Sequence, residues 1–511
     1  MIESIESADV RETVMRAFAD PQVMRDVILK LVRIKPEQRF DGKGIICAWP
    51  TRQCPVGCDY CFFDSNMSGR DEETQWTDEG VEKLIQLLSD ANMGELRLSG
   101  GGDPFVERQK INRLVEAGKV DEFTLVTSAF WAKSKDKAAL VLRELFENHS
   151  RNPHHPVTSL RMSVDEHHLT KLKPDGMQYM LNVVEHYMTN HPHDERFRLT
   201  LHTMVGDPAI DDLLARLPVT KRSELPCRQA HGPHRSEKME IVELEGGLTV
   251  RIRHAKRFYS DPEIDMNSPE AAANIASCEQ DIEELHDGHV GLVYNEGEAT
   301  GLNFGMYHDG RLLSWGGTPP DYEHDIYSDD YATMEERAYG DVITLGTLEK
   351  GDAYVRNIVG EVNPHASRRA YGIGLRDFYS RILFEESKTR LYAAVRELQD
   401  YVRDGRVTAD EILQWPTTLQ TLINAPQELL AEAHESSSFT IVEQYARNPH
   451  VTSSDLLRLH TLIQRGHYDI SEEEMANAVM SDERIAPNVR QGFVAALIEK
   501  DFVPLEALTT N

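Results

Sequence analysis

The chain contains 511 residues, of which 40% are hydrophobic, and its 85 acidic against 55 basic side chains give a formal net charge of −30. This length is typical of about two to four domains. The negative charge disfavours nucleic acid as a substrate, because a phosphate backbone would be repelled. No run reaches the ~18 apolar residues of a membrane span, and the N-terminus lacks an apolar signal region. We therefore expect a cytoplasmic protein that binds neither nucleic acid nor membrane.

The first segment of the chain predicts helices. Apolar residues recur at spacings of three and four between residues 9 and 34, which is the period of an amphipathic helix. We expect residues 1–42 to form a helical cap that packs beside the main domain and carries no chemistry.

From residue 43 onward, strand and helix patterns alternate. This alternation implies parallel strand pairing with right-handed crossovers. A sixth strand is expected in 239–244 or in 248–254. We therefore predict an α/β fold in 43–255, a partial barrel of about six βα units whose site lies at the carboxyl ends of its strands. The first five predicted strands are 44–49, 95–98, 123–127, 159–164 and 197–204.

A loop with three cysteines follows the first predicted strand. Cys54, Cys58 and Cys61 are spaced C-x3-C-x2-C, and thiolates suit iron–sulfur clusters and zinc. A structural zinc site is usually closed by four protein ligands, and no fourth ligand lies at a typical spacing. A disulfide would leave one of the three thiols over. The spacing alone leaves zinc, a disulfide and chance open as alternatives.

The spacing resembles that of radical S-adenosylmethionine (radical SAM) enzymes of the CxxxCxxC type. The resemblance implies that the three cysteines hold one [4Fe–4S] cluster, whose fourth iron binds S-adenosylmethionine. It further implies reductive cleavage to a 5′-deoxyadenosyl radical that abstracts hydrogen from the substrate, with an external electron donor such as flavodoxin or ferredoxin. Tyr60, the aromatic residue before the third cysteine, also belongs to the family pattern.

A glycine turn follows the second predicted strand. Gly101, Gly102, Asp103 and Pro104 resemble the family's Gly-Gly-Glu-Pro motif, in which backbone groups and the acidic side chain bind the methionyl ammonium. Glycines let the backbone approach closely, and a carboxylate pairs with an amine. Asp103 is one methylene shorter than the usual Glu, so its contact can run through water.

The next two strands also end in polar residues. Ser128 follows the third strand, at a place where many members carry a Thr-Asn-Gly-like turn. Ser163 and Asp165 end the fourth and resemble the Ser-Leu-Asp that lies near the cofactor ribose in many members. Singly, such residues are usually caps or turns; four strand ends in the family's order favour the resemblance. The histidine pairs at 154–155 and 167–168 are expected at the surface.

Residues 256–375 predict an α+β extension. Asp309 and Gly310 lie between two strand-like runs, 302–308 and 311–315, which is a strong hairpin signal. The stretch 340–346 also predicts a strand. The layout resembles the SPASM/twitch extension of the family without its cysteines, and we expect the hairpin to cover the active site, with Trp315, Tyr322 and Tyr327 as candidate lining residues.

The remaining thiols predict no second cluster. Cys47, Cys227 and Cys278 are not close in sequence, whereas an auxiliary cluster needs about three or four thiolates of its own. Cys47 is expected in the core. Cys227, with two histidines nearby, is a loop thiol, a metal ligand or, as a catalytic candidate, a hydrogen-atom donor.

The last segment, residues 376–511, predicts a helical domain for packing, partner binding or homodimerisation. The leading function is a radical SAM enzyme acting on a small molecule, such as a sugar, an amino acid or a natural-product intermediate. It would be an epimerase, dehydratase, lyase, dehydrogenase or mutase. The alternatives are a maturase of ribosomally made peptides and a non-catalytic iron–sulfur scaffold.

Overall fold

The computed structural model describes most of the chain. The described residues form two compact units, one built from 35–260 with 281–351 and the other from 1–34 with 261–280 and 352–511. The described ranges are 7–19, 39, 42–58, 76–91, 93–191, 194–225, 236–255, 265–269, 271–273, 276, 294–295, 298–299, 301–314, 325–362, 387–437, 442, 446, 451–466, 468 and 470–499.

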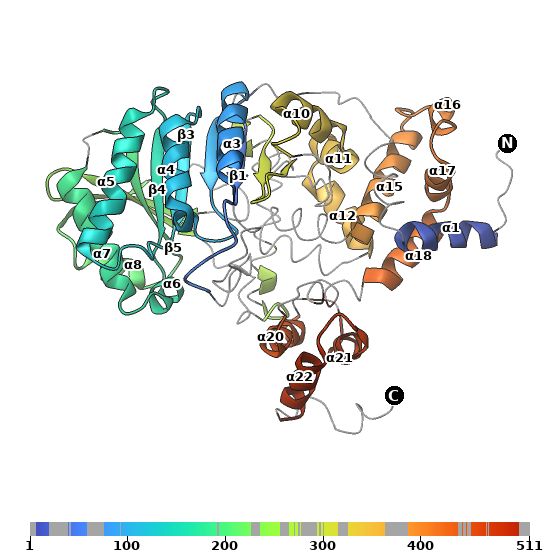
Figure 1. Ribbon diagram of the computed structural model, residues 1–511. Coiled ribbons are helices and arrows are strands. Elements are labelled where there is room, and N and C mark those ends of the chain that lie inside the picture. The colour runs from blue at the N-terminus through green and yellow to red at the C-terminus, as the bar shows by residue number, and fades with distance from the viewer. Residues whose placement is uncertain are drawn as a thin grey trace. The chain divides into compact units, whose positions relative to one another are not determined.

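The first unit is built on one mostly parallel sheet (Figure 1). Its strands lie in the order β12-β11-β1-β2-β3-β4-β5-β8-β7-β6. All five predicted strands are confirmed and pair in parallel in chain order, and β8 pairs in parallel with β5 as the sixth. These strands are β1 Ile45–Ala48, β2 Glu95–Leu98, β3 Glu122–Thr127, β4 Val157–Ser163, β5 Phe197–Met204 and β8 Thr249–Ala255.

Two antiparallel pairs border the parallel strands. At one side, β6 Val219–Leu225 pairs with β7 Ser236–Leu244, which pairs with β8. At the other side, β11 Phe304–Met306 and β12 Leu312–Ser314 form the predicted hairpin around Asp309 and Gly310. The strand β11 pairs in parallel with β1, so the described strands of the hairpin extend the sheet. A short separate pair joins β9 Tyr294–Asn295 and β10 Glu298–Ala299.

Helices cover one face of this sheet (Figure 1). Alternate strand residues such as Leu96, Leu160 and Leu201 join helix residues in one hydrophobic core. Polar side chains begin several of these helices: at the start of α3, for example, Thr77 accepts a hydrogen bond from the Gly80 N–H at 3.0 Å. The helices are α3 Asp78–Asp90, the 3₁₀ helix η2 Pro104–Glu107, α4 Arg108–Ala117, α5 Lys135–Arg151, α6 Glu166–Lys171, α7 Gly176–Asn190 and α8 Ala209–Leu214.

One predicted strand is wrong. Residues 340–346 lie in α10 Tyr331–Gly340 and α11 Val342–Lys350. Asp341 starts α11 by accepting the Thr344 N–H at 2.8 Å. The first seven residues of α11 are all buried, and a helix buried on every side has the same apolar run as an inner strand.

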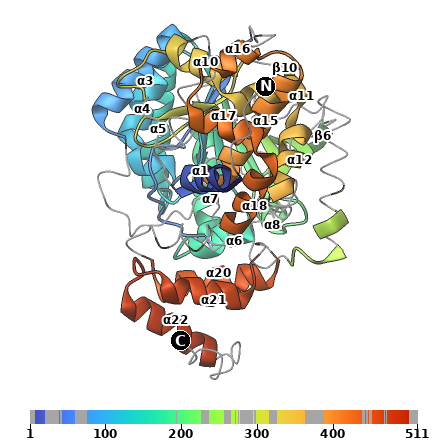
Figure 2. The ribbon, with the colours of Figure 1, turned by 90° about the vertical axis from the view of Figure 1, so that its right-hand side faces the viewer.

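The second unit is helical where it is described. Contrary to expectation, the N-terminal helix α1 Ser7–Ala19 belongs to this unit and packs against α17 Thr417–Asn424 and α18 Pro426–Ser437. The helices α20 Ser453–Gln464, α21 Glu472–Ser481 and α22 Pro487–Glu499 share a hydrophobic core of their own (Figure 2). The remaining helices are α12 Asp352–Val362, α15 Ser387–Arg403 and α16 Ala409–Ile412. Among the described residues, no helix combines the length and the apolar character needed to cross a bilayer.

Candidate functional site

The cysteine loop begins directly after β1. Cys54 and Cys58 are free thiols, partly buried against the hydrophobic core of the sheet. Cys61 and Tyr60 lie outside the described residues. Cys47 is buried inside β1, which confirms it as a core residue. Cys227 and Cys278 also lie outside the described part of the chain.

The glycine turn after β2 packs against the chain that leads into this loop. The Gly102 N–H donates to the Thr51 carbonyl at 2.5 Å, and the Asp103 N–H donates to the Gln53 carbonyl at 3.0 Å. A Cβ atom on Gly102 would lie 1.8 Å from the Gln53 oxygen, and one on Gly101 would lie 2.4 Å from the Thr51 oxygen. Both positions therefore require glycine, because only glycine permits this approach.

The Asp103 carboxylate joins the ends of two strands. It accepts hydrogen bonds from the Phe105 N–H at 3.1 Å, the Thr127 hydroxyl at 3.0 Å, and the Ser128 N–H and hydroxyl at 2.8 and 2.7 Å. These donors are all neutral, and no basic side chain of the described residues pairs with Asp103. Burial consequently raises the pKa of Asp103 above its usual value. Ser128, a predicted cofactor ligand, is thus a partner of Asp103.

Burial also raises the pKa of the Cys54 thiol. Together with the nearby charge of Asp103, it raises the pKa of Cys54 to about 12. Without a metal the thiol therefore keeps its proton, and metal binding has to release it. The shared electrostatics also show that the glycine turn and the cysteine loop are close neighbours.

His168, which the sequence predicts at the surface, lies partly buried near the cysteine loop, at the edge of the sheet where the parallel strands end. Asp165 caps α6, accepting the His168 N–H at 3.0 Å, and its other oxygen lies 2.6 Å from His168 Nδ1. Only 20% of the His168 side chain is exposed. Burial acts to lower the pKa of His168, but Asp165 and a hydrogen bond with the Cys58 sulfur outweigh it and raise the pKa well above its ordinary value.

The contact between Cys58 and His168 cannot be predicted from sequence spacing, because the two residues lie far apart in the chain. The only local signal is the Asp-x-x-His pattern after a strand, which places the two side chains one helical turn apart. The sequence predicts Asp165 near the cofactor ribose. In the structure, its described contacts are with His168, whose ring it orients. Ser163, at the end of β4, is partly buried and lies beside His202 of β5.

The donor set suits an iron–sulfur cluster. Two partly buried, unbridged thiols lie on one loop, and thiolates are the usual ligands of such clusters. Within the described residues, no three His, Cys, Asp or Glu side chains are grouped to hold a metal, and the third predicted ligand, Cys61, lies outside that part. Trp315 and Tyr322 also lie outside it, whereas Tyr327 packs beside α3, with its hydroxyl 3.2 Å from that of Thr77.

Comparisons with known proteins concern the whole chain and, in one case, the segment with the cysteine loop. No curated protein matches the chain in sequence. Among solved structures, the chain is similar to one described as "Crystal structure of HydG: A maturase of the [FeFe]-hydrogenase", with 10% identity, a TM-score of 0.24, and coverage of 98% of this chain and 88% of that one. At that score the likeness supports no argument. Residues 40–143 match the model of a 4Fe-4S single cluster domain, so the segment with the cysteine loop and the glycine turn is similar to a single-cluster iron–sulfur domain.

Proposed function

We propose that the protein is a radical SAM enzyme whose [4Fe–4S] cluster is held by Cys54, Cys58 and Cys61. One observation carries the proposal. The cysteine loop and the glycine turn meet at the carboxyl edge of neighbouring parallel strands, inside the segment that matches a single-cluster model. When bound, such a cluster supplies the electron that cleaves S-adenosylmethionine to the 5′-deoxyadenosyl radical.

The glycine turn is the proposed seat of the methionyl ammonium. Its contacts with residues 51–53 hold its backbone beside the cysteine loop. The Asp103 carboxylate is buried and has no cationic partner in the part of the chain that the structure describes, and an arriving ammonium would stabilise its charged form. In this proposal the Asp103 carboxylate provides the negative charge that pairs with the ammonium, and the hydrogen bonds from Ser128 fix the position of that carboxylate.

The fourth strand end is the proposed seat of the ribose. Ser163 offers a partly buried hydroxyl there, and Asp165 orients His168 toward the loop. Tyr60 completes the loop pattern next to the third ligand. We propose that the parallel strands curve as a partial barrel around the bound cosubstrate.

The proposed substrate is a small molecule, because the chain is strongly acidic and nucleic acid is disfavoured. Hydrogen abstraction is the step shared by the epimerase, dehydratase, lyase, dehydrogenase and mutase reactions considered above. The electron would come from a flavodoxin or ferredoxin in a reducing cytoplasm.

Anaerobic reconstitution tests this function. The full-length protein is loaded with iron and sulfide, reduced, and mixed with S-adenosylmethionine, and 5′-deoxyadenosine is measured. We expect about four irons per chain, the electron paramagnetic resonance of a reduced [4Fe–4S] cluster, and product formation. A full, reducible cluster without product would refute the enzyme and leave the scaffold alternative.

Cysteine variants locate the cluster. Cys54→Ala, Cys58→Ala and Cys61→Ala should each lose most of the bound iron. Cys47→Ala is the matched control, because it removes a buried thiol of β1 outside the loop. Equal iron in all four variants would place the metal elsewhere.

A further inference from the structure

The turn that follows β3 lies at the carboxyl edge of the sheet, and its backbone is strained at one residue. Ala129 has a φ of 57°, in the left-handed region that favours glycine, and its side chain is completely buried. A conformation of this kind persists only where the surrounding contacts fix the backbone, and it is frequent at functional sites. The contacts that hold this turn therefore indicate its role.

One hydroxyl group at the start of the turn connects three other groups. The Thr127 hydroxyl donates to the Asp103 carboxylate, whose two oxygens both lie 3.0 Å from it. The same hydroxyl oxygen accepts the Ala129 N–H at 3.0 Å and the indole N–H of Trp131 at 3.2 Å. A hydroxyl has one donor hydrogen and two acceptor lone pairs. Because both lone pairs of Thr127 are occupied, its hydrogen is directed at Asp103.

Trp131 contacts two of the residues that hold the Asp103 carboxylate. Its indole N–H binds the Thr127 hydroxyl, and its ring packs against Phe105, with the ring centroids 5.4 Å apart. Phe105 in turn donates its backbone N–H to Asp103 at 3.1 Å. The side chain of Trp131 is partly buried against the hydrophobic core of the sheet. Trp131 therefore supports the carboxylate from the β3 side and from the side of the glycine turn.

Helix α7 fixes the far end of the turn. The Ala132 N–H donates to the Ala129 carbonyl at 2.9 Å, and the Ala132 carbonyl accepts a hydrogen bond from Asn182 Nδ2 at 2.8 Å. Asn182 is buried, and Gln178, one helical turn earlier in α7, donates to its side-chain oxygen at 3.0 Å. The turn is thus bonded at both ends, and these bonds hold the backbone of Ala129 in its strained conformation.

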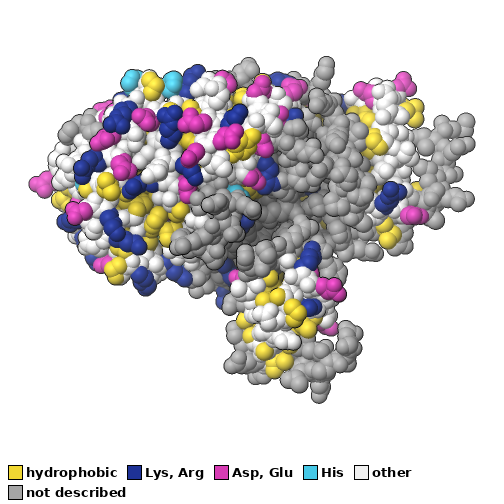
Figure 3. All heavy atoms as spheres, in the orientation of Figure 1, with side chains coloured by type: hydrophobic (Ala, Val, Ile, Leu, Met, Phe, Trp, Pro, Cys, Tyr) yellow, Lys and Arg dark blue, Asp and Glu magenta, His cyan; other side chains and the backbone are white. Residues whose placement is uncertain are grey.

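Acidic groups on the exterior of this unit differ from Asp103 in their partners. On the outer surface of α3, α4 and α5, basic and acidic side chains are intermixed (Figure 3), as in the ion pair between Arg113 and Glu82 at 2.9 Å. The described partners of Asp103, by contrast, are all neutral donors. A cationic ligand at this edge would therefore meet a buried carboxylate that is already oriented, and its charge would be balanced there.

We propose that Thr127 and Trp131 are positioning residues that fix the Asp103 carboxylate for a cationic ligand. Trp131 acts through Thr127, because its N–H keeps the hydroxyl hydrogen of Thr127 on the carboxylate. The inference rests on the proposed function for the identity of that ligand, the methionyl ammonium of S-adenosylmethionine. This arrangement is matched to a short acid: Asp103 is 5% exposed, and an added methylene would have to displace the donors that surround its carboxylate.

Anaerobic calorimetric titration of the reconstituted full-length protein tests the proposal. The probes are S-adenosylmethionine and 5′-methylthioadenosine, which keeps the nucleoside but lacks the amino-acid part. Thr127→Val should weaken S-adenosylmethionine binding roughly tenfold, as expected for losing a hydrogen bond to a charged group. Trp131→Phe, which removes the indole N–H, should weaken it roughly threefold, because its effect passes through a neutral hydrogen bond. Binding of 5′-methylthioadenosine should stay as in wild type.

Three further variants sharpen the test. Thr127→Ser keeps the hydroxyl and should retain most of the affinity. Thr203→Val is the matched control, because Thr203 is equally buried on β5 and its hydroxyl has no hydrogen-bond partner within the described part of the chain. Asp103→Glu should weaken binding, although glutamate is the usual acid of the motif that the glycine turn resembles. Urea unfolding checks that each variant is folded, and Trp131→Phe tests the same contact if Thr127→Val is not.

The outcomes separate this inference from the proposed function. A loss of S-adenosylmethionine affinity that Thr127→Ser does not share, with 5′-methylthioadenosine binding as in wild type, supports the positioning role. Unchanged affinity in Thr127→Val and Trp131→Phe overturns it, and so does an equal loss for both probes, which would indicate a general structural effect. Wild-type affinity in Asp103→Glu also overturns it. The predicted pattern of binding without formation of 5′-deoxyadenosine would refute only the proposed enzyme, whereas a wild type that binds no S-adenosylmethionine would refute both.

Discussion

Two aspartate–histidine pairs lie at opposite edges of the same sheet. At the carboxyl edge, Asp165 binds His168 at 2.6 Å. At the amino edge, Asp194 precedes β5 and lies 3.4 Å from the buried His149 of α5. The residue types are the same, but the pKa of His168 is raised and that of His149 is lowered.

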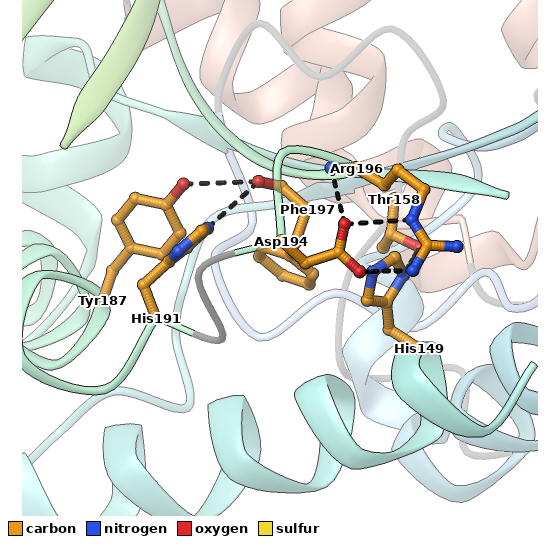
Figure 4. A network of polar contacts seen from close by, with 7 residues as sticks. All are labelled: His149, Thr158, Tyr187, His191, Asp194, Arg196 and Phe197. Atoms are coloured by element: carbon orange, nitrogen blue, oxygen red, sulfur yellow. Dashed lines mark hydrogen bonds and ion pairs between the residues drawn. The ribbon is translucent and has the colours of Figure 1, made fainter. Parts of the chain in front are cut away.

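The pair at the amino edge differs because Arg196 forms hydrogen bonds with the carboxylate of Asp194 (Figure 4). Arg196 donates to Asp194 through its backbone N–H at 3.0 Å and its Nε at 2.9 Å. This contact lowers the pKa of Asp194 to about 2. Burial then dominates for His149, lowers its pKa, and keeps it neutral.

The same edge is closed by further internal contacts (Figure 4). The Tyr187 hydroxyl donates to the Phe197 carbonyl at 3.4 Å, and His191 Nε2 lies 3.2 Å from that oxygen. At the carboxyl edge, by contrast, no basic side chain of the described residues pairs with Asp103, and His168 forms a hydrogen bond with the Cys58 sulfur. The two edges therefore differ in how their carboxylates are neutralised: an arginine pairs with Asp194, whereas Asp103 is held by neutral donors.

Among these predictions, we expect the largest loss of stability when a side chain is introduced at Gly102, at the carboxyl edge of the sheet. In Gly102→Ala the new Cβ would lie 1.8 Å from a backbone oxygen, so the turn must separate from the cysteine loop. We expect a destabilisation above ~3 kcal/mol and loss of the cluster, measured by urea unfolding and by iron content. Gly340→Ala is the control, because its Cβ meets no atom within 4 Å. Normal iron content in Gly102→Ala would contradict the role of this contact.

A smaller effect is expected from His168. In His168→Phe the ring remains but the hydrogen bond to the Cys58 sulfur is lost. Such hydrogen bonds favour the reduced cluster, so its reduction potential should fall by on the order of tens of millivolts. A redox titration followed by electron paramagnetic resonance measures the shift. His149→Gln, at the other edge, should leave the potential unchanged; an equal shift in both variants would argue against a local cause.

The smallest effect concerns the pH dependence of stability. The folded pKa of His149 lies below the ordinary value of about 6.5, so the unfolded chain takes up the proton first. The stability that this residue contributes is therefore complete above that pH and is lost as the pH falls below it. Asp194 stays ionised in this range.

Urea unfolding at pH 7.5 and 5.5 checks this prediction. His149→Gln should reduce the difference between the two pH values by on the order of 1 kcal/mol. Replacing the exposed His154 by Gln is the control, and it should leave the difference as in wild type. A wild-type difference that persists in His149→Gln would assign the pH dependence to other groups.

Local signals account for what the sequence predicted well. The strand order follows from the alternation of strands and helices, and the hairpin follows from Asp309 and Gly310, whose turn needs the positive φ of 86° found at the glycine. The need for glycine at Gly101 and Gly102 was also readable, although their described partners are residues 51–53. Each of these signals depends on neighbours in sequence.

The errors come from contacts between distant segments. Nothing near His168 reveals that Cys58 is its neighbour. The apolar run at 340–346 fits a strand and a buried helix equally, and only packing decides between them. The grouping of α1 with α17 and α18 depends on residues some 400 positions apart, which no periodicity records.

The pairing of β11 with β1 has a consequence for biosynthesis. The Trp49 N–H donates to the Met306 carbonyl at 2.8 Å, and the Ile45 N–H donates to the Asn303 side chain at 2.9 Å. A nascent chain that ends before these residues leaves β1 with an open hydrogen-bonding edge, which favours association with other chains. The edge of β1 is therefore paired only after the ribosome has passed Met306, the last residue of β11.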